Sequence, residues 1–151
     1  MSLLEKVNGD LKESMKARDD IRNNTLRQIK TAVMNTEIKK SKPLSDEEII
    51  EVIFSLVKAH YDSIDGFKKG GRMELVEKEE KELVILKAYL PEQLSDEDLK
   101  KIIGEAISAT GAASAKDMGK IMGYVMPKVK GRADGSKINQ IAKQLLEKPA
   151  Q

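Results

Sequence analysis

The chain has 151 residues, enough to bury a hydrophobic core as one domain or as two small ones. It contains no cysteine, which excludes disulfide bonds, thiolate metal sites and cysteine nucleophiles. No apolar run approaches the ~20 residues that span a bilayer. The N-terminal segment MSLLEKVNGDLKE becomes acidic and amphipathic too early for a signal peptide. We therefore expect a cytoplasmic protein without a membrane partner.

Charge is distributed unevenly along the chain. The net charge is only +2, from 27 basic and 25 acidic side chains. Residues 1–91 carry 17 of each kind, whereas residues 111–148 carry eight basic and three acidic ones, a local net charge of +5. This asymmetry indicates an anionic partner for the C-terminal end, although a solvated lysine face would have the same composition.

Four amphipathic helices are predicted before Pro91. Ser2 can cap the first, and Ser45 with Glu48 forms a capping box for the third. The fourth is highly charged and runs from about Met73 to Tyr89. The apolar positions that define the first two helices are Leu3, Leu4, Val7, Leu11 and Met15, then Ile21, Leu26, Ile29 and Val33.

Pro91 ends the fourth helix, because the residue before a proline avoids the helical region. Three more helices are predicted after it. Ser95 opens the first, Ser114 with Asp117 the second, and Asp134 or Ser136 the third. We therefore predict an all-α fold, with an N-terminal four-helix subdomain over residues 1–91 and a C-terminal three-helix subdomain over residues 92–151.

Three segments of the chain resemble a known family. They are LRQIKTAVMNTEI (Leu26–Ile38), LKAYLPEQLSDEDL (Leu86–Leu99) and KDMGKIMGYVMPKVKGRADGSKI (Lys116–Ile138). Together they resemble the YqeY family, which is similar to the tail domain of the B subunit of the glutamine-dependent Asp/Glu-tRNA amidotransferase. The resemblance extends from the first helix to about Leu146, and its third segment is the most specific.

The resemblance implies binding of tRNA or another structured RNA, with a possible protein partner in an amidation or translation complex. In the amidotransferase the tail domain helps to hold the tRNA, and the chemistry belongs to other domains. This chain offers no glutaminase nucleophile and no ATP site. Amidotransferase activity of its own, a carbon–nitrogen ligase reaction with glutamine as donor, is therefore the least favoured interpretation. Neither a cofactor nor DNA binding is expected.

Other candidates for chemistry are weaker. His60 is the only histidine, and Asp62 and Ser63 are its neighbours on one helix, so a catalytic triad is not expected. With no second histidine and no cysteine, a transition-metal site is not expected either. The acidic residues Glu77, Glu79, Glu80 and Glu82 alternate with lysines, which is typical of a solvated helix face.

The segment after Ser114 contains glycines and lysines that a helix packed against a core does not require. Met118, Ile121, Met122, Val125 and Val129 share one helical face and form the predicted core stripe. The opposite face carries lysines and two glycines, each of which costs about 1 kcal/mol relative to alanine inside a helix. The glycines therefore indicate a close neighbour, either a second helix or a ligand that approaches the backbone.

Pro127 cannot donate to the carbonyl of Gly123, so this helix should kink or end there. It is followed by a basic loop, GRADGSK, whose spacing differs from that of a nucleotide-binding P-loop. The next helix should present free amides near Asp134 that favour a phosphate. The predicted RNA-binding residues are Lys116, Gly119, Lys120, Gly123, Pro127, Lys128, Lys130, Arg132 and Lys137.

Few aromatic residues accompany these cations, so we expect recognition of a folded RNA by shape and phosphate rather than stacking of single-stranded bases. A protein-interaction module, in which the glycines receive a partner helix, remains the alternative.

Overall fold

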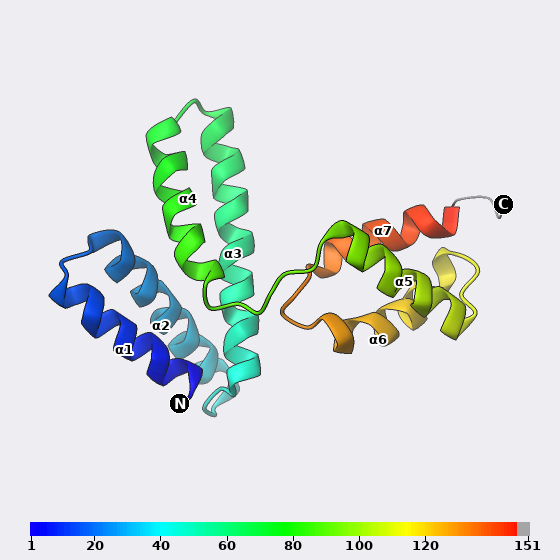
Figure 1. Cartoon of the computed structure of the whole chain (residues 1–151), viewed down its shortest axis with the longest axis horizontal. Coiled ribbons are helices and arrows are strands. Elements are labelled where there is room, and N and C mark those ends of the chain that lie inside the picture. Colours follow the sequence, from blue (N-terminus) through cyan, green and yellow to red (C-terminus); the bar gives the residue numbers. More distant parts are fainter. Residues whose placement is uncertain (148–151) are drawn as a thin grey trace. The chain divides into compact units, whose positions relative to one another are not determined.

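The computed structural model describes residues 1–147 (Figure 1). Within this range it contains seven α-helices, one 3-10 turn and no strand, so the predicted all-α fold is confirmed. The chain divides into two compact units, Met1–Leu90 and Pro91–Gln151, each with a hydrophobic core of its own. Lys148, which contributes to the basic C-terminal stretch, lies outside the described residues, as does the end of the second predicted subdomain.

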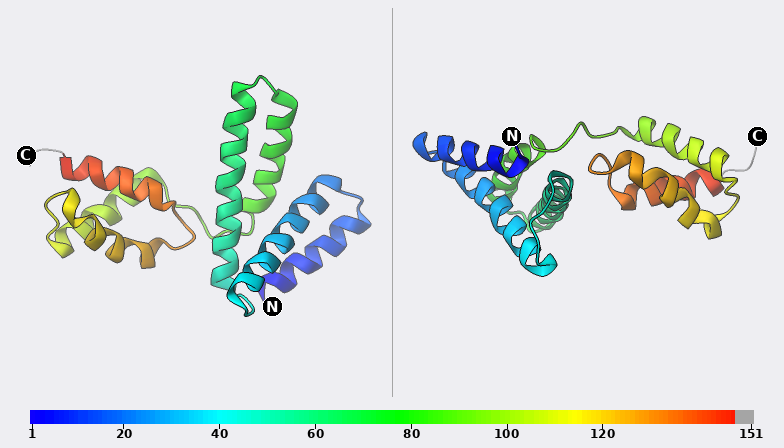
Figure 2. Two further views of the ribbon diagram at one scale, coloured as in Figure 1. Left: turned by 180° about the vertical axis from the view of Figure 1, so that it is seen from behind. Right: turned by 90° about the horizontal axis from the view of Figure 1, so that it is seen from below.

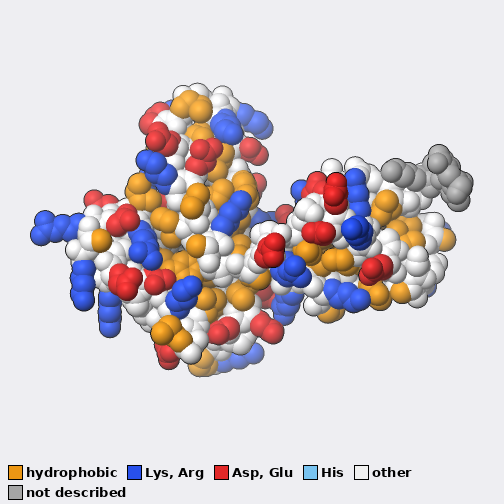
Figure 3. Space-filling view, viewed as in Figure 1, with side chains coloured by type: hydrophobic (Ala, Val, Ile, Leu, Met, Phe, Trp, Pro, Cys, Tyr) orange, Lys and Arg blue, Asp and Glu red, His pale blue; other side chains and the backbone are white. Residues whose placement is uncertain are grey.

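The N-terminal unit consists of α1 (Leu3–Lys16), α2 (Asp20–Lys40), α3 (Asp46–Lys69) and α4 (Met73–Lys87). Figures 1 and 2 show α3 and α4 side by side as one antiparallel pair, and α1 and α2 as another. Helix α2 also packs against α3 and α4, which joins the two pairs. Lysine, arginine and acidic side chains are interspersed over the face of this unit seen in Figure 3.

Local signals set the starts of α1 and α3. Ser2 and Ser45 each accept a hydrogen bond from the amide three residues later, and Glu5 and Glu48 bond back to the cap amides. Both are capping boxes, as predicted for Ser45.

Lys40 Nζ lies 2.6 Å from Glu48 Oε2. This hydrogen bond from Lys40, with those from Ser45, lowers the pKa of Glu48 to about 2.

The core of the N-terminal unit forms where the apolar stripes of its four helices meet. Its most deeply buried side chains include Val7, Leu26, Ile29, Ile53 and Leu86, each 0% exposed. Met15, expected in the apolar set of the first helix, is instead 50% exposed. Ser14 takes the inward position in its place, where its hydroxyl lies within hydrogen-bonding distance of two acceptors, the carbonyl of Leu11 and Oδ1 of Asn23.

The C-terminal unit contains α5 (Asp96–Thr110), a 3-10 turn (Ala115–Asp117), α6 (Met118–Val129) and α7 (Gly135–Glu147). Helix α5 packs against both α6 and α7, which also contact each other (Figure 2). Ser114 caps the 3-10 turn rather than α6 itself, so the sixth helix begins later than the sequence suggested. Leu99, Ile103, Ile121, Val125, Val129 and Ile138 form the centre of this core.

Two loops far apart in the sequence are hydrogen-bonded to each other in the C-terminal unit. The amide of Leu94 donates to the carbonyl of Arg132 (2.9 Å), and Arg132 Nε donates to the carbonyl of Glu92 (3.1 Å). Gln93 Nε2 donates to the carbonyl of Gly131 (2.9 Å), whose φ of 75° suits a residue without Cβ. The segment before α5 is thereby held against the loop between α6 and α7. Both loops belong to the segments that carry the family resemblance.

None of the helices in residues 1–147 is long and apolar enough to cross a membrane.

Replacing a core residue of α4 should destabilise the N-terminal unit. Leu86 is fully buried, so Leu86→Ala removes buried methyl groups and leaves a cavity, at a cost of about 2–5 kcal/mol in the free energy of unfolding. Val84 is 70% exposed on the same helix, and Val84→Ala should change the free energy by less than about 0.5 kcal/mol. Urea denaturation followed by NMR signals of residues 1–90 measures both, and equal effects would contradict the assigned core.

Arg132→Ala should loosen the contact between the two loops. Loss of the bond from Arg132 Nε to the Glu92 carbonyl should lower the stability of the C-terminal unit by about 1 kcal/mol. Amide hydrogen exchange at Leu94, whose N–H is bonded to residue 132, should become faster. Lys143 is exposed on α7, so Lys143→Ala provides the control and should leave this exchange rate unchanged.

Candidate nucleic-acid interface

The turn before α6 determines the charge at the start of that helix. Asp117 Oδ2 accepts a hydrogen bond from the amide of Ala113 (2.9 Å), and this bond lowers the pKa of Asp117. One oxygen of the carboxylate is thus already hydrogen-bonded to the backbone of its own turn. Lys120 Nζ lies 3.9 Å from Asp117 Oδ1, and the Lys120 side chain is 67% exposed. Such a long, solvated ion pair contributes little, so Lys120 remains available to an anion.

The inner side of α6 is a core stripe, as the sequence predicted. Ile121, Val125 and Val129 are each 0% exposed. Met118 and Met122 are half-buried and pack against the same core, so these methionines fill the interior rather than line a binding surface.

The outer side of α6 is open. We call the exposed side formed by Lys116, Gly119, Lys120, Gly123 and Pro127 the glycine face. A Cβ atom added to Gly119 or Gly123 would meet no atom within 4 Å. No helix of the C-terminal unit therefore packs against these glycines, and packing within this unit does not account for them.

Pro127 does not end α6, which continues to Val129. The sequence predicted a kink or an end at this position, and an end is wrong. Proline fixes φ near a helical value, so the last turn can form around it, and what is lost is one backbone hydrogen bond. The carbonyl of Gly123 therefore lacks its usual donor four residues later, on a face where both residues are exposed.

Lys128 lies at the flank of the glycine face and is held by an aromatic ring. Its Nζ is 4.2 Å from the centroid of the Tyr124 ring and 3.0 Å from the Tyr124 hydroxyl. Both residues are on α6, one turn apart, and Lys128 is exposed. A cation–π contact of this kind leaves the ammonium charge unneutralised and restricts its position.

The remaining predicted cations have different surroundings. Lys130 is exposed and follows α6 as its C-cap residue. Arg132 is half-buried and bonded to Glu92, and Lys137 Nζ lies 2.6 Å from Asp96 Oδ1 at the start of α5. Arg132 and Lys137 thus bond to other segments of the unit. Lys120 and Lys128 contact Asp117 and Tyr124, which lie within one turn of them, and Lys116 is exposed.

The N-terminus of α7 is a weaker anion-binding site than the sequence predicted. Asp134 Oδ1 accepts a hydrogen bond from the amide of Ser136 (3.0 Å). A carboxylate from the chain itself therefore occupies the helix N-terminus, where a phosphate was expected to find free amides.

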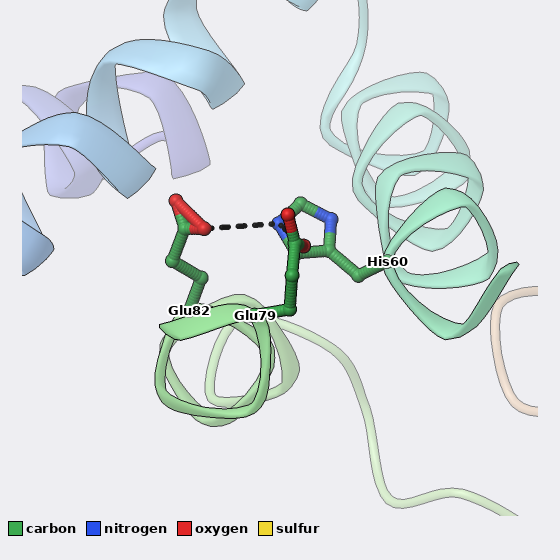
Figure 4. A group of neighbouring side chains, drawn as sticks. All are labelled: His60, Glu79 and Glu82. Carbon is green, nitrogen blue, oxygen red and sulfur yellow. Dashed lines mark ion pairs between the residues drawn. The ribbon is translucent and has the colours of Figure 1, made fainter. Parts of the chain in front are cut away.

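A group of residues in the N-terminal unit was not predicted from the sequence. His60 on α3 lies next to Glu79 and Glu82 on α4 (Figure 4). The prediction that the acidic residues of α4 form a solvated face is wrong for Glu82, which is 3% exposed. The sequence did contain one indication of this group, because the three-residue spacing of Glu79 and Glu82 places both on one face of α4. Their contact with His60 could not be predicted, since it depends on how α3 packs against α4.

Several known proteins that are similar to this chain share one name. Altered inheritance of mitochondria protein 41, mitochondrial, of Eremothecium gossypii is 39% identical over 82 residues, which are 54% of this chain and 45% of that protein. The protein of the same name from Pyrenophora tritici-repentis is 29% identical over 134 residues, 87% of this chain and 73% of that protein. The chain thus spans less than half of the first relative's length.

These relatives contradict the expected cytoplasmic location, because each is named as a mitochondrial protein. The expectation was drawn from the lack of an apolar span and of a signal-peptide pattern. Those features bear on secretion and membrane insertion, and they do not separate the cytoplasm from the interior of an organelle.

The comparison with protein families agrees with the three segments that first carried the resemblance. The family model of Yqey-like proteins matches residues 4–146, which include both helical units up to the last turn of α7. The chain belongs to the family of Yqey-like proteins.

Proposed function

We propose that this protein binds structured RNA, with tRNA as the first candidate, through the glycine face of α6 and the flanking Lys128. One observation carries the proposal: two helix-interior glycines face open space between exposed lysines. Glycine destabilises a helix, so an uncovered pair needs an external reason. A polyanion that approaches the helix backbone supplies one.

The charges on this face suit a phosphate backbone. Lys116 and Lys120 lie one helical turn apart, and Lys128 lies two turns beyond Lys120. Phosphate contacts by lysine release counterions and supply most of the non-specific affinity for nucleic acids. The absence of side chains at Gly119 and Gly123 permits a close approach of the sugar–phosphate chain between these cations.

The carbonyl of Gly123 favours RNA over DNA. Pro127 removes the usual intrahelical donor to this carbonyl, which leaves it an acceptor for a donor from a ligand. The ribose 2′-hydroxyl is a donor that DNA lacks, and proteins use it to distinguish RNA from DNA. We therefore expect tighter binding of an RNA hairpin than of the DNA hairpin of matching sequence.

The lysines of the turn and α6 are better candidates for phosphate contacts than the loop cations. Arg132 supports the loop through Glu92, and Lys137 is paired with Asp96. Replacing Arg132 would disturb the fold of the unit as well as its charge, and Lys137 would have to leave Asp96 to contact a phosphate. Lys130 extends the basic surface beyond the end of α6.

A partner helix is the second candidate occupant of the glycine face. Met126, 37% exposed near the end of α6, adds an apolar contact that such a helix could use. This alternative predicts capture of a protein in high salt that survives ribonuclease treatment and is lost in Gly123→Leu.

Charge reversal on the proposed interface should weaken RNA binding strongly. The variant K116E/K120E/K128E removes three phosphate contacts, so the slope of log K against log[salt] should become shallower by about 2.7, from about 0.9 per phosphate. Titration of labelled tRNA between low and moderate salt, followed by fluorescence anisotropy, measures this slope. Binding should be nearly abolished at moderate salt.

The matched control reverses three exposed lysines of the N-terminal unit, K12E/K16E/K39E, with the same change in net charge. It should retain most of the affinity and most of the salt slope. Equal losses in both variants would indicate only a general effect of charge, and unchanged binding in K116E/K120E/K128E would exclude this face.

Replacing a glycine by alanine should have opposite effects on the stability of the unit and on its affinity for RNA. Gly123→Ala meets no atom within 4 Å, so the helix should gain up to about 1 kcal/mol in stability while RNA affinity falls. Gly104→Ala on α5 also meets no atom within 4 Å and should stabilise the unit without affecting RNA affinity. Thermal unfolding and the same anisotropy titration measure the two effects. Equal RNA affinities for the two variants would show that the RNA does not approach the backbone at Gly123.

A further inference from the structure

A histidine and two glutamates converge between α3 and α4 (Figure 4). His60 Nε2 lies 3.3 Å from Glu79 Oε2 and 3.6 Å from Glu82 Oε2. The two glutamates are three residues apart on α4, which directs both toward α3. One imidazole nitrogen and two carboxylates thus share a small volume, with ligand atoms all within 4.8 Å of one another.

The burial of this group makes its charge significant. His60 is 7% exposed and Glu82 is 3% exposed, so both are more than nine-tenths buried. Gln28 Nε2 donates to Glu82 Oε1 at 2.7 Å, which satisfies one oxygen of this carboxylate and orients the other toward His60. No lysine or arginine within the described residues forms an ion pair with Glu79 or Glu82. A buried carboxylate without a cation is strongly disfavoured.

The hydrogen bonding of His60 leaves Nε2 to face the carboxylates. Nδ1 lies 2.8 Å from the carbonyl oxygen of Leu56, which can only accept a hydrogen bond, so Nδ1 carries the hydrogen. In the neutral ring, Nε2 then presents a lone pair to two carboxylate oxygens and has no donor of its own. A histidine that donates one N–H to a backbone carbonyl is the usual arrangement for a metal ligand.

The distances leave room for a metal ion between these atoms. A charge-assisted hydrogen bond from a protonated imidazole would be about 2.7–2.9 Å long. The observed separations are longer. The ligand–ligand edges of a tetrahedral zinc site are about 3.3 Å for bonds of about 2.0–2.1 Å. The distance from His60 Nε2 to Glu79 Oε2 equals this edge, and the distance to Glu82 Oε2 is somewhat longer.

We propose that His60, Glu79 and Glu82 bind a divalent transition-metal ion, for which Zn²⁺ is the natural probe. His60 Nε2 and one oxygen from each carboxylate supply three ligands, and water takes the fourth position. Two carboxylates neutralise the ion, and the imidazole favours Zn²⁺ over Mg²⁺, which prefers oxygen ligands and octahedral geometry. The ion would connect α3 to α4 and so stabilise the N-terminal unit.

Direct binding provides the first test. The tag-free chain, treated with a chelator and then exchanged into buffer, should bind one equivalent of Zn²⁺ in a calorimetric titration, and its melting temperature should rise. Mg²⁺ at the same concentration should produce neither effect. Glu79→Gln keeps the shape of the side chain and should weaken Zn²⁺ binding more than tenfold, while Glu80→Gln, at an exposed position of the same helix, should not.

A readout at the ligand itself completes the experiment. His60 is the only histidine, so the imidazole nitrogens of the tag-free protein give one set of signals in a long-range ¹H–¹⁵N spectrum. The Nε2 signal should shift on addition of one equivalent of Zn²⁺, and Nδ1 should keep its proton. Circular dichroism of the metal-free Glu79→Gln variant shows whether it remains folded. If it unfolds, the His60 signals of the wild-type chain decide alone.

Absence of stoichiometric Zn²⁺ binding, or equal affinities in Glu79→Gln and Glu80→Gln, would overturn the proposal. A His60 spectrum unchanged by Zn²⁺ would do the same, and would leave an ion pair with a protonated histidine as the explanation of the group.

Discussion

The proposed interface depends on one packing constraint, the burial of the inner stripe of α6. Ile121, Val125 and Val129 are fully buried against α5 and α7, which fixes the rotation of the helix about its axis. Once these residues face inward, Gly119, Gly123 and Pro127 must face outward. The open backbone is thus a geometric consequence of the core, and a ligand at this face would need no rearrangement of the helix. Loss of the stripe would remove both the fold of the unit and the orientation of its exposed lysines.

The sequence was sufficient for features that depend on neighbouring residues. The Ser45–Glu48 capping box, the inward stripe of α6 and the termination of the fourth helix before Pro91 all follow from contacts within a few positions. The exposed glycines also follow from helical spacing, because residues opposite a core stripe face away from it. The periodicity was less informative for α1, where Ser14 rather than Met15 points inward to bond with Asn23 of the next helix.

Features that join distant segments could not be obtained in this way. Arg132 was assigned to an RNA contact from its charge, yet its side chain is bonded to the carbonyl of Glu92, 40 residues earlier. Lys137 similarly forms an ion pair with Asp96 of another helix. The group around His60 is the clearest case, because single-sequence reasoning looked for a second histidine or a cysteine and discounted glutamates on a charged helix. A charge pattern does not reveal which one of several acidic residues the packing of a neighbouring helix will bury.

Charge within the C-terminal unit also bears on how an RNA would lie on it. Residues 92–110, which include α5, carry two basic and five acidic side chains, whereas residues 111–147 carry seven basic and three acidic ones. The pairing of Lys137 with Asp96 lowers the positive potential where α7 begins, and the carboxylate of Asp134 lowers it further. A polyanion would therefore be repelled from the start of α5 and attracted to the lysines of α6. Opposed charges of this kind orient a ligand as well as bind it, because each wrong placement brings phosphates close to carboxylates. The acidic start of α5 thus complements the glycine face, and it would restrict a bound RNA to one side of the three-helix unit.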